Sequence, residues 1–278
     1  MDKNPSTGHT IEQNGPPFLR ALYLWEGRAM YLGELVDNTP HSHHALQAVL
    51  SLGEPFRLHT DNSWHTGCFA LIAPDHEHQL EGSELNQILL LMDQETVAAQ
   101  DLVSRCLSDK KVLIMDDLPR ETDISKFRET ISVCREAYSC KHASSLAENV
   151  ITILGKSAGQ KAKPMNEWVQ RALEVIREID ADKVSVGEIA SKVFLSESRL
   201  THLFTREVGI PIRRYLLWRR MVQGIQMVLS GSSLTDAAHT AGFSDSAHMS
   251  RTFRDMFGFT PSEILKNSRF IQVFSCIA

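Results

Sequence analysis

The pattern of apolar and polar positions changes twice along the chain. From Phe18 to about Asp93, short apolar runs alternate with turn residues such as Gly53-Glu54-Pro55. The clearest runs are Ala45–Leu52, Phe56–His59, Cys68–Ile72 and Gln87–Met92. Short runs at this spacing are typical of strands in a β-sandwich or β-barrel.

From about Gln94, apolar residues recur at helical spacing instead. The segment Glu95–Leu107 predicts one helix, and Ile124–Leu154 predicts two helices with a turn near Cys140. The apolar stripes of these helices suit a dimer interface. They equally suit packing on the chain's own strands, and the sequence leaves both interpretations open.

Residues 155–163 are small and polar, which is typical of a linker. Beyond them, amphipathic segments predict a series of helices. These are Asn166–Ile179, Val186–Val193, Glu197–Glu207, Ile212–Leu229, Ser233–Thr240, Ser246–Phe257 and a last short one from Pro261 to Leu265.

One arrangement occurs twice in this half: a short helix, a tight turn and a second helix with a polar face. The two copies are offset by about 48 residues, as between Ala190 and Ala238. Ser196 in the first copy, and Ser244 or Asp245 in the second, are the expected N-caps. This is the helix-turn-helix plan, in which the second helix enters a major groove of DNA. The intervening helix Ile212–Leu229 spans about 27 Å, which suits two such helices in successive grooves about 34 Å apart.

The composition is that of a globular protein, with 42% hydrophobic and 23% charged residues. It excludes a disordered, collagenous or coiled-coil chain. No apolar run approaches the roughly 18–20 residues of a transmembrane helix, and the polar segment Met1–Pro17 does not resemble a signal peptide. Five scattered cysteines without a CxxC motif indicate reduced thiols in a cytosolic protein. They are Cys68, Cys106, Cys134, Cys140 and Cys276.

The net charge of -5 is unevenly distributed. Residues 1–163 contain 15 basic and 22 acidic side chains, whereas residues 164–278 contain 14 and 12. Several arginines lie between Arg199 and Arg254. The planar fork of arginine donors suits base edges and phosphates, although a solvated helix face has a similar composition.

Residues 164–268 resemble the DNA-binding domain of the AraC/XylS family of bacterial transcriptional regulators. The resemblance is carried by Ile189-Ala190, Leu195–Leu200, Leu203-Phe204, Gly209, Tyr215, Arg220-Met221, Ala238, Gly242–Asp245, Ser250–Phe253, Phe257-Gly258 and Thr260–Ser262. The run from Ala241 to Ser262 is its most specific part. The first half resembles, less closely, the cupin-like effector and dimerisation domain of that family, including Pro74–His78.

The resemblance implies an α+β chain of two domains. Residues 18–154 would form a cupin-like β-barrel with a helical dimerisation segment, after a flexible N-terminus at 1–17. Residues 164–268 would form an all-α domain with two helix-turn-helix units joined by a long helix, followed by an apolar tail at 269–278. The implied function is that of a cytoplasmic, sequence-specific regulator of transcription. Its double-stranded site would be roughly 17–20 base pairs long, which is about two major-groove turns. The protein would be an effector-responsive activator, a homodimer that works with RNA polymerase, with no enzyme activity and no cofactor.

The resemblance also assigns the DNA contacts. In the first unit, base readout is expected from Ser198, Thr201 and His202, with Arg206 near a phosphate or a base. In the second unit, it is expected from Ser246, Ala247 and Arg251, with Ser250 and Arg254 nearby. Arg199 and Arg254 are expected to meet phosphates, which position the protein without specifying sequence.

Two residues depart from the family pattern. Phe194 stands in the first turn where a small residue is usual, and we expect its ring to pack into the core. Gly224 stands in the long helix where alanine is usual, at a cost of about 1 kcal/mol in helix propensity. A softer connecting helix that lets the two units adjust to each other is the hypothesis that this glycine suggests.

Seven of the twelve histidines lie between His41 and His78. Because residues i and i+2 share a strand face, adjacent strands could bring His41, His43 and His78 together. Three imidazoles with an open position suit a divalent transition metal. However, no carboxylate follows His43 before Glu54, and a polar, histidine-rich pocket or loop accounts for the same residues. We therefore predict no metal and keep the three histidines as candidates.

The effector is not identified by the sequence. Candidate residues for its binding are Trp25, Tyr31, His43, Trp64 and His78. Two other interpretations stay open: a metal-dependent cupin enzyme that carries a DNA-binding tail, and a regulator controlled by a protein partner docked on the first domain.

Overall fold

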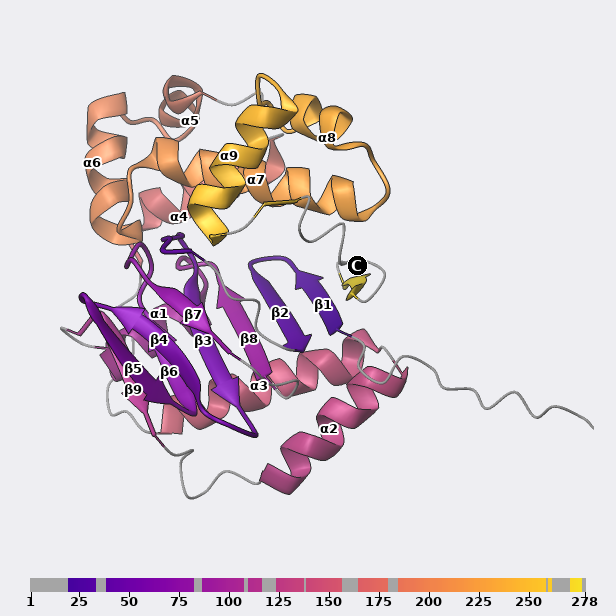
Figure 1. Ribbon diagram of the computed structural model, residues 1–278. Helices are drawn as coiled ribbons and strands as arrows, with labels where there is room; N and C mark the ends of the chain where they lie inside the picture. Colours follow the sequence, from indigo (N-terminus) through magenta and orange to yellow (C-terminus); the bar gives the residue numbers. More distant parts are fainter. Residues whose placement is uncertain are drawn as a thin grey trace, which may run out of the picture.

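A sheet-rich region is followed along the chain by a helical region in the computed structural model (Figure 1). The structure describes residues 20–33, 39–82, 87–107, 110–116, 124–137, 139–156, 165–179, 185–258, 260–261 and 271–276. The predicted N-terminal segment 1–17, most of the predicted linker and most of the predicted helix Pro261–Leu265 lie outside these residues. Within them, no helix combines the length and apolar character that a membrane span requires.

The described strands form two sheets. The larger sheet contains, in spatial order, β10 (Ile271–Ser275), β1 (Arg20–Trp25), β2 (Arg28–Gly33), β8 (Gln87–Met92), β3 (Leu46–Ser51), β6 (Phe69–Ile72) and β9 (Val112–Met115). The smaller sheet contains β5 (Ser63–Gly67), β4 (Phe56–Thr60) and β7 (Gln79–Glu81). All pairs are antiparallel except β1 with β10.

Both faces of the larger sheet are buried, one by helices and the other by the smaller sheet. Successive side chains of one strand point to opposite faces, so they pack against different layers. On β3, Ala48 and Leu50 pack toward helices, whereas Val49 packs with Phe56 and Leu58 of the smaller sheet. This double burial explains why β3 and β6 are continuous apolar runs in the sequence.

The described strands do not close into the β-barrel that the resemblance implies. The smaller sheet stacks on one face of the larger sheet, and the two are separate hydrogen-bonded units. The isolated bridge between His41 and His78 is the point where the segment before β3 meets the segment before β7. The arrangement is therefore an open sandwich, one of the two architectures that the spacing of the apolar runs indicates.

The predicted helices of the first region are confirmed in type. They are α1 (Val97–Leu102), a π-helical turn η1 (Val103–Leu107), α2 (Ile124–Ala137) and α3 (Cys140–Lys156). The buried side chains of α2 and α3, among them Phe127 and Leu146, belong to the same apolar cluster as the larger sheet. The apolar stripes of these helices thus pack on the chain's own strands, and the predicted dimer interface stays a prediction.

The second region consists of six helices within the described residues. They are α4 (Glu167–Glu178), α5 (Val186–Lys192), α6 (Glu197–Val208), α7 (Ile212–Leu229), α8 (Leu234–Thr240) and α9 (Ser246–Phe257). Helix α7 supplies Tyr215 to an apolar cluster with α4–α6, and Met221 to a second cluster with α8 and α9. One helix therefore contributes to two small apolar cores, one for each helix-turn-helix unit. Helix α7 runs from the first unit to the second (Figure 1).

The C-terminal tail returns to the first region rather than packing on the domain that precedes it. Strand β10 pairs in parallel with β1, and the ring centroids of Tyr23 and Phe274 are 5.0 Å apart. A disulfide joins Cys276 to Cys140 at the start of α3. The prediction of five reduced thiols is wrong for this pair, because the fold brings together two cysteines 136 positions apart. Cys68, Cys106 and Cys134 are not part of this disulfide.

Candidate nucleic-acid interface and its contact with the first region

The two helix-turn-helix units have the same backbone hydrogen bonds at their turns. In the first, Leu195 N donates to the Ala190 carbonyl. In the second, Phe243 N donates to the Ala238 carbonyl, and both distances are 2.9 Å. Ser196 caps α6 and Asp245 caps α9, each accepting from a backbone N–H in the first turn. The internal repeat that the sequence predicts is confirmed, and the two units share equivalent hydrogen bonds at the turn and at the N-cap.

Phe194 does not pack into the core as expected. Its side chain is 87% exposed, and its backbone has a left-handed conformation with φ of 57°. The core of this unit is already filled by neighbours such as Val193 and Leu200. The turn therefore bends without glycine and directs the ring into solvent.

The predicted contacts of α6 lie along its outer side. Ser198, Arg199, His202 and Arg206 are exposed and Thr201 is half-buried. The Arg206 guanidinium pairs with the neighbouring Glu207 carboxylate at 3.0 Å. A surface pair of this kind is weak, so the guanidinium remains free to exchange partners.

The predicted contacts of α9 have a similar distribution. Ala247, Arg251 and Arg254 are exposed, whereas Ser246 and Ser250 are half-buried. The Ser250 hydroxyl donates to the Ser246 carbonyl at 2.7 Å, which occupies its proton within the helix. Arginine is therefore the main exposed donor on this face.

Gly224 lies where α7 meets the second unit. A Cβ built on this glycine would come within 2.7 Å of Met249 Cε and 3.4 Å of Ala241 Cβ. The residue is buried in the middle of the helix. Close packing is thus a structural reason for this glycine, distinct from the softer helix that the sequence suggests.

Helix α7 contacts the first region through two buried hydrogen bonds. The Trp218 indole N–H donates to Asp93 Oδ1 at 3.0 Å, and the Tyr215 hydroxyl donates to Glu95 Oε1 at 2.5 Å. Both carboxylates follow β8, and both are nearly inaccessible to solvent. These bonds fix α7 against the end of the larger sheet.

The charges around these bonds are strongly perturbed. Burial, reinforced by the nearby Glu95 carboxylate, raises the pKa of Asp93 to about 6. Burial alone would lower the pKa of His44, but the carboxylates of Asp75 and Glu95 outweigh it and raise that pKa to about 9. A cationic His44 therefore lies 3.4 Å from the Glu95 carboxylate in the interior.

The end of α9 contacts the first region at a second place. The Thr39 backbone N–H and hydroxyl both donate to the Gly258 carbonyl, at 3.2 and 2.9 Å. Nearby, Arg214 of α7 pairs with Asp75 at 3.2 Å. The segment 39–44 and the loop at Asp75 therefore contact both α7 and the end of α9.

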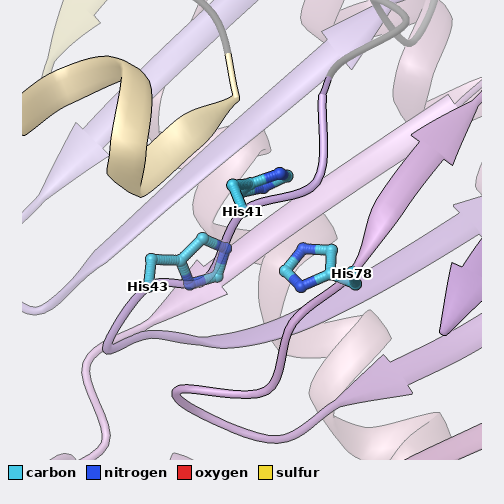
Figure 2. A group of neighbouring side chains, drawn as sticks. All are labelled: His41, His43 and His78. Carbon is cyan, nitrogen blue, oxygen red and sulfur yellow. The ribbon is translucent and has the colours of Figure 1, made fainter. Parts of the chain in front are cut away.

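His41, His43 and His78 meet beside this contact (Figure 2). One side-chain nitrogen from each lies within 4.8 Å of the others, and all three residues are buried. Burial lowers the pKa of each ring, that of His41 to about 4, so all three are neutral near pH 7. The sequence-based grouping of these histidines is observed.

The other candidate effector residues do not come together. Trp25 packs near Tyr23 and Arg28 on the larger sheet. Trp64 is 39% exposed on the smaller sheet, against His59 and Arg57. Neither has a described contact with the histidine cluster, and Tyr31 lies on β2, in the register position opposite Leu22 and Leu89.

The sequence did not single out the residues that join the two regions. Asp93 and Glu95 follow an apolar run, and Trp218 is one of the apolar positions of the predicted helix Ile212–Leu229. Gln47, whose side chain faces His43, lies in an apolar run. The sequence offers one indication of this contact, an apolar run followed by the two acidic residues. That pattern is too common to identify a contact between regions.

Comparison with known proteins supports the interpretation of the helical region. Residues 189–267 match the family model described as a helix-turn-helix domain. The chain is 30% identical over 112 residues to the uncharacterized HTH-type transcriptional regulator YidL of Escherichia coli K12, covering 40% of this chain and 38% of YidL. It is 33% identical over 105 residues to the arabinose operon regulatory protein of Escherichia coli K12, covering 36% and 35%. The chain thus spans less than two-fifths of the length of these relatives.

Longer similarities extend over both regions. The probable transcriptional regulator LumQ of Photobacterium leiognathi is 23% identical over 239 residues, which cover 81% of this chain and 91% of LumQ. The crystal structure of ToxT from Vibrio cholerae O395 has a TM-score of 0.58 at 13% identity, covering 87% of this chain and 98% of ToxT. The two-region fold is thus shared with ToxT. Together with the helix-turn-helix match, these relatives agree with the resemblance to the AraC/XylS family, and they show a helix-turn-helix domain similar to those of transcriptional regulators.

Proposed function

We propose that the protein regulates transcription by binding a specific DNA site through α6 and α9, in response to an effector that acts on its first region. The observation that carries this proposal is the duplicated helix-turn-helix unit with an exposed polar face on each second helix. Relatives of this chain are transcriptional regulators, which favours this function over an enzyme.

Direct readout would come from Arg251 on α9 and His202 on α6, two exposed side chains with N–H groups. An arginine fork can donate to both acceptors of a guanine in the major groove. Small side chains such as Ala247 leave room for a thymine methyl group. Arg199 and Arg254 would meet phosphates and set the position of each helix on the duplex.

Control by an effector is supported by the contact between the two regions. Trp218 and Tyr215 of α7 are held by Asp93 and Glu95 of the first region. A ligand that favours one arrangement of this contact shifts the population of DNA-binding conformations. ToxT, which shares the fold, has been crystallised with an unsaturated fatty acid bound.

We place this activity in the cytosol, with the protein as a homodimer that activates transcription through RNA polymerase. The first region would carry the dimer contact, as it does in the family that the chain resembles. A cupin-like sensor is the finer description that we propose for this region.

In vitro selection of bound fragments from random DNA, with the purified full-length protein at a stated salt concentration, tests the proposal. We expect one motif of roughly 17–20 base pairs with two blocks about one helical turn apart. Recovery of only diffuse, salt-sensitive binding in every condition would contradict it.

Two substitutions refine the assignment. Arg251→Ala should cost about 1–3 kcal/mol on the selected site and relax one base position. Arg254→Ala should weaken binding similarly on all sequences and reduce the salt dependence. Arg57→Ala, on the smaller sheet, is the matched control and should change neither.

A further inference from the structure

We propose that His41, His43 and His78 bind one divalent transition-metal ion, and that its binding controls how the helix-turn-helix domain is held. The metal part of this inference stands alone, whereas the control part rests on the proposed function. The effector class is then a metal ion such as Zn²⁺.

The three rings are oriented as metal ligands require. His41 Nδ1 is 2.9 Å from the Thr39 carbonyl, His43 Nδ1 is 3.1 Å from the Ala45 carbonyl, and His78 Nδ1 is 2.9 Å from the His76 carbonyl. Because a carbonyl only accepts, Nδ1 is the protonated nitrogen in His41 and in His78. Their Nε2 atoms therefore carry lone pairs, and such an outer hydrogen bond is the usual way in which proteins orient a metal-binding imidazole. In His43 both ring nitrogens face oxygen atoms, so an ion at Nε2 replaces the contact of that nitrogen with Gln47 Oε1.

One of these lone pairs has no hydrogen-bond partner. His78 Nε2 is buried and makes no hydrogen bond, in a residue that is 1% exposed. An unsatisfied buried acceptor costs about 1–3 kcal/mol. If the cluster only filled space, an apolar ring at this position would avoid that cost. A metal ion in front of the three rings gives the lone pair its partner.

The distances suit an ion after small side-chain rotations. The candidate nitrogens lie within 4.8 Å of one another. Three nitrogens on a tetrahedral zinc, each at about 2.0–2.1 Å, are roughly 3.3 Å apart. Gln47 offers an oxygen atom as a further metal ligand, since its Oε1 atom is 2.7 Å from His43 Nε2. Three imidazoles with one oxygen suit zinc and neighbouring transition metals better than calcium or magnesium.

The ligands also belong to the contact between the two regions. The His43 ring lies 6.2 Å from the Trp218 ring and 6.1 Å from the Phe257 ring, centroid to centroid. The same short segment supplies Thr39, which bonds to Gly258 at the end of α9, and His44, which pairs with Glu95. Drawing His41 and His43 onto one ion therefore rigidifies the segment on which α7 and α9 rest.

A rigid support holds the two helix-turn-helix units in one arrangement before DNA arrives. This lowers the ordering cost of binding, so the metal should raise the affinity for the specific site. Coupling between sites of this kind is typically 5–150-fold, and we expect about tenfold.

Metal binding is tested on the full-length protein, without a polyhistidine tag and stripped with a chelator. Zn²⁺ alone or Co²⁺ alone should bind at one ion per chain, and Co²⁺ should develop visible d–d absorption that Zn²⁺ displaces. His78→Phe and His41→Phe, which keep a ring in the core, should abolish stoichiometric binding. His65→Ala, an exposed histidine on β5, should bind as the wild type does. Thermal melts identify which variants are folded. The site is disproved if the wild type binds no ion, or if both folded phenylalanine variants bind one normally.

Control by the metal is tested on the DNA fragment selected above. Zn²⁺ should tighten binding about tenfold for the wild type and for His65→Ala, and should leave folded His78→Phe unchanged. An ion that binds without changing DNA affinity would overturn the control part. Absence of specific DNA binding with and without Zn²⁺ would overturn the proposed function, while the metal titration still decides the site.

Discussion

Phe194 and Gly242 occupy equivalent positions in the two helix-turn-helix units, and both have a left-handed backbone, with φ of 57° and 77°. The N–H of Phe194 donates to the Ser191 carbonyl, and that of Gly242 to the His239 carbonyl, both at 3.1 Å. Glycine adopts this conformation without steric cost, whereas a residue with a Cβ pays roughly 1–2 kcal/mol. The first turn therefore contains strain that the second avoids.

Replacing Phe194 by glycine should relieve this strain. We expect Phe194→Gly to raise the free energy of unfolding by about 0.5–1 kcal/mol, since glycine's entropy cost offsets part of the gain. Urea denaturation of the full-length protein measures it. Phe194→Ala keeps the Cβ and removes only the exposed ring, so it should be nearly neutral. A loss of stability in the glycine variant would mean that the ring makes stabilising contacts.

The repeat that contains these two residues could be predicted because its signals are local. Caps such as Ser196 and Asp245, the two turns and the apolar spacing lie within a few residues of each other. The boundaries of α7 and α9 agree with the sequence-based prediction for the same reason. The conformation of Phe194 could not be predicted, because a local pattern does not show that the core beneath the turn is full.

The bond between Trp218 and Asp93 should contribute to holding α7 on the first region. Trp218→Phe keeps an aromatic ring near His43 but removes the indole N–H, leaving Asp93 Oδ1 without that donor. We expect the contact between α7 and the first region to be weakened by about 1–3 kcal/mol of free energy. In calorimetry, one unfolding transition should then separate into two, because the two regions no longer unfold together. Trp168→Phe on α4, where the indole stacks with Arg171, is the control. Equal losses in both variants would contradict the assignment.

The buried Asp93 carboxyl should make stability depend on pH. It faces Glu95, His44 and Arg219, and its pKa is raised from 3.8 to about 6. The folded protein therefore binds this proton more tightly than the unfolded chain. The resulting stabilisation is complete below about pH 4 and is lost as the pH rises through 6.

Asp93→Asn isolates this contribution because the amide does not titrate. The wild type minus Asp93→Asn difference in unfolding free energy should fall by about 1 kcal/mol between pH 5 and 7.5. Urea denaturation at several pH values measures it. Gln100→Ala on α1 removes no titrating group, so it should give a difference that stays constant. A constant difference for Asp93→Asn as well would show that the carboxyl is not protonated in this range.

Contacts between distant parts of the chain account for what the sequence could not predict. Strand β10 pairs with β1, although the two strands lie near opposite ends of the chain. Nothing in the sequence near Ile271 identifies β1 as its partner. The pairing of Asp93 with Trp218 is equally remote. The histidine cluster is an intermediate case, since strand alternation suggested the three residues, but only the fold shows that the Nδ1 atoms face carbonyls.

The cross-link between Cys140 and Cys276 should stabilise the folded chain. It closes a loop of 136 residues, so breaking it enlarges the conformational freedom of the unfolded state. We expect Cys276→Ser to lower the free energy of unfolding of the oxidised protein by about 2–4 kcal/mol. Reduction of the wild type should give the same value. Cys106→Ser, which removes a free thiol, should have little effect, and a wild type insensitive to reduction would contradict the expectation.

Gly224 and Met249 should be energetically coupled if packing explains the glycine. Gly224→Ala alone gains about 1 kcal/mol of helix propensity, but its Cβ would lie 2.7 Å from Met249 Cε and force that side chain to move. The two effects should nearly cancel. In a Met249→Ala background the methionine is gone, so the same alanine should then stabilise by about 1 kcal/mol.

A double-mutant cycle measured by urea denaturation gives the coupling directly, and we expect about 1 kcal/mol. Gln223→Ala is one position earlier on α7 and therefore points about 100° away from Gly224 around the helix, so it should show no coupling with Met249. The softer-helix hypothesis expects a different result. Under that hypothesis, Gly224→Ala raises the free energy of unfolding equally in the wild-type and Met249→Ala backgrounds. It also changes DNA affinity, which can be measured in the same variants with the DNA fragment from the in vitro selection.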